Sequence, residues 1–306
     1  MSGGRRTLAI AGTALAIVVV LVAGLVASRW RGGPGIAVGD TLYEIHRTDG
    51  AGVPGDPERP VFVLVLGHDA RPGETTSRAD AIHLVGVNAA RRAATIVNIP
   101  RDTYVDIPGF GRDKINAAFA YGGPDLAAAT VSALAGVAIP YVISTGFAGL
   151  TAMVDELGGV ALDIPVAMND PKSGAVFAPG PARLGGAQAL AFSRNRSLPG
   201  GDFARTENQG RLILAALAEL RARDASPAAR LGQLATLLRH GRVDGAGLGD
   251  LYRLGELALS LDPANVANVT LPGRGGRVGA ASVVLLEPSA GALLADVAVD
   301  GVLDGG

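Results

Sequence analysis

Four segments of this chain place charged side chains where core or turn residues would be expected. Three of them lie at the ends of apolar runs, and the fourth leads into a long amphipathic stretch. The segments are LGHDAR (66–71), SRADAI (77–82), NIPRD (98–102) and AFSRNRSLPGGDFARTENQGR (191–211). Ligands of open α/β sheets gather beyond the ends of the strands. The positions of these segments therefore predict that some of their side chains share one site.

The arginines of these segments suit a diphosphate. A guanidinium presents a planar fork of donors that matches phosphate oxygens, and it stays charged at neutral pH. Arg101 and Arg194 lie at predicted element ends, and Arg205 and Gln209 share one face of a predicted helix at i, i+4. Charge-assisted hydrogen bonds contribute on the order of 1.5–3 kcal/mol each, so a few of them could hold a diphosphate without a nucleotide-binding fold.

Two aspartates, Asp69 and Asp80, belong to the same segments. Carboxylates beside a diphosphate would repel it unless a cation lies between them. Mg²⁺ or Mn²⁺ binds carboxylates together with substrate phosphates, and we expect Asp69 and Asp80 to be its ligands. Asp102 has a structural alternative, because it could cap the backbone or pair with Arg101.

Other common sites are excluded by the sequence. It contains no G-x-x-x-x-G-K-[ST] phosphate loop and no G-x-S-x-G motif, and its four histidines lack zinc-ligand spacing. The glycine-rich stretch 272–279 (PGRGGRVG) fits a dinucleotide motif poorly and is predicted to be a loop. Cysteine is absent, and a net charge of −1 provides no overall field to attract nucleic acid.

The apolar pattern predicts a layered α/β domain in which strands and helices are mixed along the whole chain. Continuous apolar runs predict buried strands, and longer amphipathic stretches predict helices. The predicted strands are 61–66, 81–87, 95–99, 103–107, 140–145, 160–164, 266–271 and 283–286, with a possible strand near Leu42–Ile45. The predicted helices are 113–120, 124–135, 147–157, 186–193, 202–223, 227–239, 247–259 and 288–297.

The N-terminus carries a predicted membrane anchor. Thr7–Ser28 is 22 residues without a charge, about 33 Å as a helix against a hydrocarbon core of about 30 Å. A cleaved signal peptide is the alternative, but the apolar run is longer than usual and no clear A-x-A site follows it. Two arginines flank each end of the run, and the two N-terminal ones together with the α-amine favour a cytoplasmic N-terminus. We expect a tail and anchor at 1–31, a lead-in at 32–59 and an extracytoplasmic catalytic domain at 60–300.

Several multi-residue motifs resemble, in order, the LytR-CpsA-Psr family of cell-wall phosphotransferases. They include GHDAR, RADAI, NIPRDTYVDIPGFGRDKINAAFAYGGP, LGGAQALAFSRNR and GGDFARTENQ, and the resemblance is strong over about 60–225. It implies a three-layer αβα sandwich with a mixed central sheet and an apolar tunnel for a polyprenyl-diphosphate-linked glycan. It also implies that a glycosyl phosphate moves from that lipid to a sugar hydroxyl of peptidoglycan or another cell-wall acceptor, with no nucleic acid as partner.

The resemblance also implies roles for individual side chains. Asp69 and Asp80 would bind Mg²⁺, and Arg71 would support Asp69. The diphosphate would be bound by Arg101, Arg194, Arg196, Arg205 and Gln209. Catalysis would depend on Asp80, Arg101 and Asp69, with either aspartate a candidate base, although a metal-bound carboxylate is a poor one.

Three positions depart from the family pattern. Ala81 stands where threonine usually follows the second aspartate, and Asn208 and Gly210 stand where arginine and a second glutamine are common. None of these changes removes an assigned charge. A glycine early in a helix costs about 1 kcal/mol.

Two other functions would use the same predicted site. A polyprenyl-diphosphate pyrophosphatase would use water in place of the acceptor. A membrane-anchored lipid-binding or regulatory module would hold the carrier without turnover. Two carboxylates facing a diphosphate favour an enzyme, because a passive lipid binder has no need of them.

Overall fold

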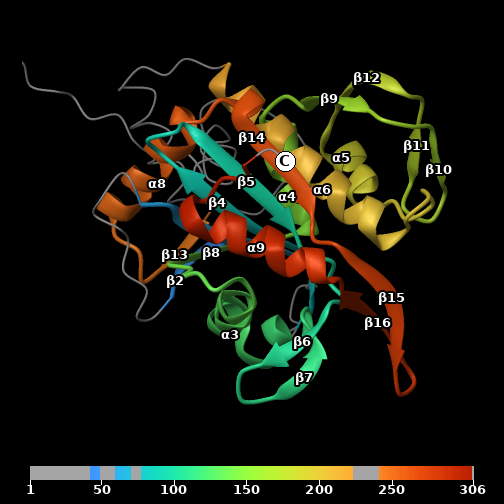
Figure 1. Cartoon of the computed structure of the whole chain (residues 1–306). Coiled ribbons are helices and arrows are strands. Elements are labelled where there is room, and N and C mark those ends of the chain that lie inside the picture. The colour runs from blue at the N-terminus through green and yellow to red at the C-terminus, as the bar shows by residue number, and fades with distance from the viewer. Residues whose placement is uncertain (1–41, 49–58, 70–76, 223–240, 305–306) are drawn as a thin grey trace, which may run out of the picture.

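The computed structural model describes residues 42–48, 59–69, 77–222 and 241–304 (Figure 1). The predicted anchor and tail at 1–31, the helix predicted at 227–239 and Arg71 lie outside these residues. Within the described ranges, no helix combines the length and the apolar character needed to cross a bilayer.

A seven-stranded mixed sheet forms the centre of the fold, with strand order β13-β2-β8-β3-β4-β5-β14. The strands are β2 (Tyr43–Arg47), β3 (Val61–His68), β4 (Ala79–Asn88), β5 (Ala93–Asn98), β8 (Tyr141–Gly146), β13 (Gly241–Asp244) and β14 (Val266–Thr270). β4 runs antiparallel to both of its neighbours, β3 and β5. β8 runs parallel to β3, and β14 runs parallel to β5. The end of β3, the start of β4 and the end of β5 therefore meet at one edge of the sheet.

The possible strand near Leu42–Ile45 belongs to this sheet. It is β2, which pairs antiparallel with β8, and its side chains Tyr43 and Ile45 are buried. Part of the predicted lead-in therefore contributes to the core, and the folded region extends N-terminal to residue 60.

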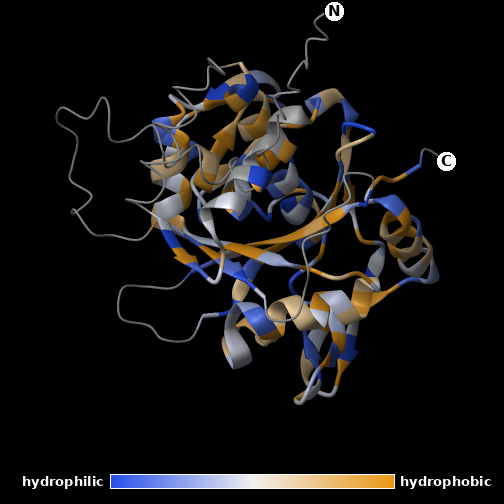
Figure 2. Ribbon diagram, turned by 90° about the vertical axis from the view of Figure 1, so that its left-hand side faces the viewer, coloured by the Kyte–Doolittle hydropathy of each residue, from blue (hydrophilic) through white to orange (hydrophobic). Residues whose placement is uncertain are grey.

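Helices cover both faces of the sheet, and each face has its own hydrophobic core (Figures 1 and 2). One face packs against α3 (Ala117–Ala135) and α9 (Pro288–Asp300), and the other against α4 (Phe147–Glu156), α5 (Gly186–Arg194), α6 (Asp202–Arg221) and α8 (Leu248–Ser260). In β3, Leu64 and Leu66 belong to the first core and Val63 to the second. Successive strand side chains point to opposite faces, so a continuous apolar run fits a strand covered on both sides.

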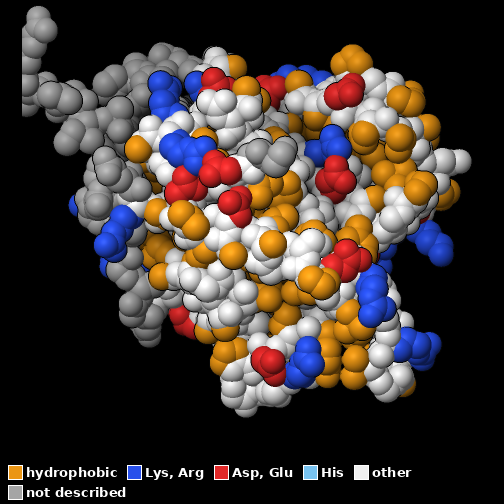
Figure 3. Space-filling view, viewed as in Figure 1, with side chains coloured by type: hydrophobic (Ala, Val, Ile, Leu, Met, Phe, Trp, Pro, Cys, Tyr) orange, Lys and Arg blue, Asp and Glu red, His pale blue; other side chains and the backbone are white. Residues whose placement is uncertain are grey.

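Two-stranded sheets extend from this central body. They are β6 (Tyr104–Ile107) with β7 (Gly111–Lys114), β9 (Val160–Ile164) with β12 (Gly180–Leu184), β10 (Met168–Asp170) with β11 (Ala175–Phe177), and β15 (Gly273–Val278) with β16 (Ala281–Leu286). A short 3₁₀ turn, η1 (Pro263–Asn265), precedes β14. The β6–β7 and β15–β16 hairpins project at the lower end of the molecule, where hydrophobic and charged side chains lie side by side (Figures 1 and 3).

Two sequence predictions were wrong in this region. Residues 272–279, predicted as a loop, contain the whole of β15, because β16 pairs with 273–278 along the hairpin. The helix predicted at 113–120 begins only at Ala117, because residues 111–114 pair with β6 as β7. In both cases the pairing partner, rather than local propensity, decides the structure.

Gly210 lies in α6 where this helix contacts β5 and β14. A Cβ atom at this position would lie 2.0 Å from Oδ1 of Asn268 and 2.6 Å from Oδ1 of Asn98. We expect Gly210→Ala to lower the free energy of unfolding by about 1–3 kcal/mol, although alanine is the better helix former. Urea unfolding measures the change. Gly291→Ala in α9 is the control, because a Cβ there meets no atom within 4 Å; if both variants gain stability, close packing at Gly210 is refuted.

Candidate functional site

The charged segments come together around one cavity of about 950 Å³ at the edge of the sheet. Its lining includes both charged and apolar side chains. On α6, Arg205 and Gln209 are followed by Leu212, Ile213 and Ala216. On the other elements, the apolar lining comprises Val65, Leu66, Leu150, Met153, Val154 and Leu157. The cavity therefore has a charged part at the sheet edge and an apolar part between the sheet and its helices.

Arg101 and Asp80 stand on neighbouring strand ends. After β5, the amide of Thr103 donates to the carbonyl of Pro100 at 3.0 Å, and this turn carries Arg101. Asp80 lies at the start of the adjacent strand β4, and Nη1 of Arg101 contacts its Oδ1. The antiparallel pairing of β4 and β5 thus places Arg101, at the end of a buried strand, beside the carboxylate of Asp80.

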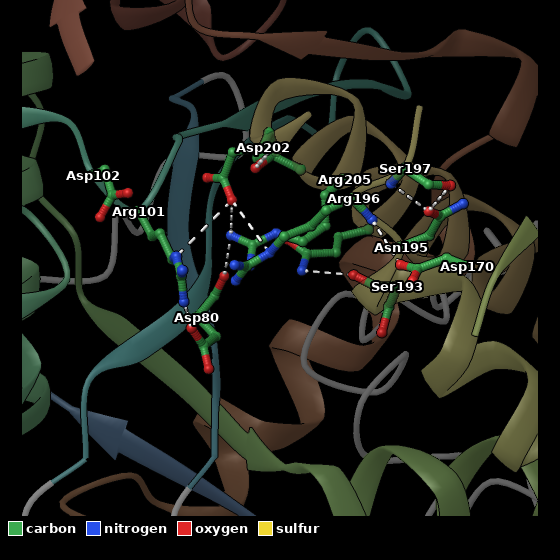
Figure 4. A network of polar contacts seen from close by, with 12 residues as sticks. Asp80, Arg101, Asp102, Asp170, Ser193, Asn195, Arg196, Ser197, Asp202 and Arg205 are labelled. Carbon is green, nitrogen blue, oxygen red and sulfur yellow. Dashed lines mark hydrogen bonds and ion pairs between the residues drawn. The ribbon is translucent and has the colours of Figure 1, made fainter. Parts of the chain in front are cut away.

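The carboxylate of Asp202, in the first turn of α6, lies close to three of the predicted diphosphate ligands (Figure 4). Its Oδ1 lies 2.9 Å from Nη2 of Arg205, 3.8 Å from Nε of Arg196 and 3.9 Å from Nε of Arg101. Three guanidinium groups this close would otherwise repel one another. Sequence reasoning assigned no role to Asp202, although its i, i+3 spacing to Arg205 was a usable signal.

Arg205 is buried, with 3% of its surface exposed. Burial lowers its pKa to about 10. The neighbouring arginines lower the pKa further and Asp202 raises it, so the guanidinium stays charged at neutral pH. Its Nη2 donates to the backbone carbonyl of Asp80 at 3.3 Å. Within the described chain, its buried Nε has no hydrogen-bond acceptor. A buried cation with an unused donor is suited to an anion that completes its contacts.

The remaining predicted side chains join α6 to the end of α5. Nε2 of Gln209 donates to the carbonyl of Ser193 at 3.1 Å. The guanidinium of Arg194 lies 4.9 Å from the centre of the Phe147 ring, and the side chain of Arg196 is 49% exposed. Arg194 and Arg196 therefore lie on the solvent side of the cavity, and Arg205 lies inside.

The structure brings together all the predicted site residues that it describes. The cavity is lined by Asp69, Asp80, Arg101, Arg194, Arg196, Arg205 and Gln209. Asp102 does not pair with Arg101. It points away from the cluster (Figure 4), and its Oδ1 lies 3.0 Å from Nζ of Lys114.

Sequence reasoning did not identify three further ionisable side chains that line the cavity: His83, Asp170 and Lys172. Asp170 ends β10 and Lys172 lies in the turn that follows, whose sequence shows no ligand-binding pattern. The lining has five lysine and arginine side chains and three aspartates, and Asp202 beside the arginines brings the acids to four. This excess of positive charge favours an anionic ligand.

Asp69 and Asp80 direct two carboxylates to the same cavity. Burial lowers the pKa of His68, and the charges of Glu44, Asp69 and Asp80 act in the opposite direction. No cluster of three or more His, Cys, Asp or Glu ligands occurs in the described part of the chain. Two carboxylates fit Mg²⁺, which takes its other ligands from phosphate and water.

His83 is a buried histidine on β4 whose Nδ1 donates to Oδ1 of Asn98 at 2.7 Å. Burial lowers its pKa from 6.5 to about 4; the Asn98 hydrogen bond opposes this shift, and the charge of Arg205 adds to it. The unfolded chain therefore binds a proton first as the pH falls. The stabilisation from neutral His83 is complete above about pH 6.5 and is lost towards pH 4, by up to about 3 kcal/mol.

His83→Gln tests this pH dependence. Urea unfolding of the wild type should show a larger loss of stability between pH 7 and pH 4.5 than unfolding of the variant, which has no proton to bind at this position. Parallel pH profiles for the two proteins would refute the assignment.

Comparisons with known proteins agree with this geometry. The sequence model of the LytR_cpsA_psr family matches residues 41–295. The polyisoprenyl-teichoic acid–peptidoglycan teichoic acid transferase TagU of Bacillus anthracis (strain CDC 684 / NRRL 3495) is 38% identical over 186 residues, which are 58% of this chain and 60% of that protein. The chain thus spans about 60% of the length of this curated relative.

Two solved structures share the fold. TagV of B. subtilis has a TM-score of 0.68 at 21% identity, covering 81% of this chain and 99% of that one. TagT bound to LIIa-WTA has a TM-score of 0.64 at 26% identity, covering 83% of this chain and 94% of that one. Because the family match covers most of the sequence, including every described site residue, this chain belongs to the LytR-CpsA-Psr family.

Proposed function

We propose that this protein transfers a glycosyl phosphate from a polyprenyl-diphosphate-linked glycan to a sugar hydroxyl of peptidoglycan. The observation that carries the proposal is the cavity itself. Its arginines surround a charged end that suits a diphosphate, and its apolar end, between the sheet and α4 and α6, suits a prenyl chain. A soluble nucleotide would have no use for the apolar part.

The relatives support the same activity. The TagU relative is named as a teichoic acid transferase acting on peptidoglycan, and TagT is described as bound to LIIa-WTA. The residues that match the family model include the motifs of the site, and the site residues of this chain keep the charges that a diphosphate requires.

In the proposed reaction, a hydroxyl oxygen of the acceptor attacks the phosphorus nearest the sugar. The bond from that phosphorus to the bridging oxygen breaks, polyprenyl phosphate leaves, and the hydroxyl proton passes to a base. Arg205 and Arg101 would hold the diphosphate from opposite sides of Asp202, and Arg194 and Arg196 would contact it from the solvent side. Positioning and charge stabilisation would supply most of the rate enhancement, as in other phosphoryl transfers.

Asp69 and Asp80 would hold Mg²⁺ or Mn²⁺ in this proposal. The cation would neutralise charge on the phosphate oxygens. We also propose that the N-terminal apolar segment anchors the chain in the plasma membrane as a single span, with its N-terminus cytoplasmic and this domain outside, where both the lipid carrier and the cell wall would be within reach.

The test uses the full chain in detergent with a lipid-diphosphate-linked glycan, with and without a peptidoglycan acceptor. We expect acceptor-bound glycosyl phosphate and polyprenyl phosphate only when the acceptor is present. Release of inorganic phosphate from polyprenyl diphosphate without acceptor would instead indicate a pyrophosphatase. Lipid retention without any turnover would indicate a binding or regulatory module.

A further inference from the structure

Two aromatic side chains of this aromatic-poor chain are stacked on its surface. Phe110 is 57% exposed and Tyr121 is 43% exposed, and their ring centres are 5.0 Å apart with 19° between the planes. Aromatic residues make up only 4% of the sequence. Among the described residues, the other exposed large hydrophobic side chains are all valines. Clustered exposed apolar groups of this kind mark binding surfaces.

The backbone presents Phe110 instead of burying it. Its amide donates to the carbonyl of Ile107 at 2.9 Å, which closes a turn through Pro108 and Gly109. Gly109 has φ of 80°, the conformation that a type II turn requires at its third residue, with proline favoured at the second. The ring is therefore held at the tip of the β6–β7 hairpin by a turn of defined geometry.

Polar groups surround the aromatic pair. The hydroxyl of Tyr121 donates to Oδ2 of Asp113 at 2.6 Å. On the same hairpin, the guanidinium of Arg112 lies 4.7 Å from the centre of the Tyr104 ring, and Asp106 is within 3.9 Å of Arg112. Flat rings bordered by carboxylate and guanidinium groups suit a sugar, whose C–H face packs on a ring while its hydroxyls form hydrogen bonds at the edge.

The residues that follow this hairpin contact the turn that carries Arg101. The amide of Asn116 donates to the carbonyl of Arg101 at 3.2 Å, and Nζ of Lys114 lies 3.0 Å from Asp102. Asn116 leads directly into α3, and Tyr121 follows it by little more than one helical turn, about 8 Å. The backbone of Arg101 is therefore linked to the start of the helix that carries Tyr121.

We propose that Phe110 and Tyr121 form a platform on which a sugar ring of the acceptor glycan stacks, next to the sugar whose hydroxyl enters the reaction. This inference rests on the proposed function and assigns a place to its acceptor. Carbohydrate is favoured over a lipid surface because the charges beside the rings are mixed, with Asp106 near Arg112 and Asp113 bonded to Tyr121, whereas anionic headgroups are bound by clusters of basic side chains.

The test measures binding of tetra-N-acetylchitotetraose, a β-1,4-linked glycan, to the full chain by calorimetry. Phe110→Ala should raise the dissociation constant about tenfold. Phe110→Leu should bind as weakly as Phe110→Ala, and Phe110→Trp should bind as tightly as the wild type. The affinity for inorganic diphosphate should stay the same in all three variants. Val299→Ala, which changes a side chain of α9 that is 79% exposed, is the matched control and should bind the glycan normally.

Three results would overturn the platform. The first is that the wild type does not bind chitotetraose, and the second is that Phe110→Ala binds it as well as the wild type does. The third is that Phe110→Ala loses only binding to phosphatidylglycerol vesicles, or only self-association measured by sedimentation. In a transfer assay, Phe110→Ala should raise the KM for acceptor without changing the kcat. If no variant transfers anything but glycan binding still depends on Phe110, the proposed function fails and the sugar site remains.

Discussion

Arg101→Ala will reduce kcat/KM for glycosyl-phosphate transfer by about 10²–10³-fold while leaving the fold intact. Arg101 stands at the end of β5, where its guanidinium contacts Asp80 and lies 3.9 Å from Asp202. Its side chain is only 22% exposed, so water cannot fully replace it as a partner of phosphate oxygens. In the proposed reaction, loss of the fork would remove charge stabilisation from the leaving phosphate.

Two further variants separate the contribution of charge from that of geometry. Arg101→Lys keeps the charge but not the bidentate fork, and should retain intermediate activity. Arg242→Ala, on β13, removes an arginine whose side chain is 67% exposed and should have no effect. Unfolding in urea checks that the Arg101 variants are folded, and full activity of Arg101→Ala would remove this residue from the mechanism.

Asp80→Asn will have opposite effects on binding and on transfer. The carboxylate of Asp80 contacts the guanidinium of Arg101, and a diphosphate must compete with it for the same donor. In EDTA, we expect the variant to bind inorganic diphosphate about tenfold more tightly, because a competing ion pair and a repelling charge are both removed. Transfer should fall about 100-fold, because one of the two proposed cation ligands is lost.

Asp102→Asn is the matched control for this experiment. Asp102 is the next residue after Arg101, but its carboxylate binds Lys114 and points away from the cluster (Figure 4). The control should leave diphosphate affinity in EDTA unchanged. Weaker diphosphate binding by Asp80→Asn in EDTA would show that the Asp80–Arg101 pair orders the site and does not compete with the ligand.

Much of the secondary structure could be predicted from local pattern. The apolar run of β3 and the helix of α6 are encoded by side chains that are neighbours in the sequence, so their periodicity is visible without a fold. The failures at β7 and β15 occurred where a strand is short or rich in glycine. Such a segment has little preference of its own, and it becomes a strand only because a partner supplies its hydrogen bonds.

The sequence by itself determined which chemistry this protein could offer. Arginine, aspartate and glutamine at Arg101, Arg205, Asp80 and Gln209 suit a diphosphate and a cation, and this follows from the side chains alone. Only the tertiary structure decided which of these groups meet. Strand order and direction bring the start of β4 beside the end of β5, and the path of α6 places Asp202 among three arginines. Asp102 lies one residue from Arg101 yet faces Lys114, because electrostatic contacts depend on distance in space, which chain neighbours do not specify.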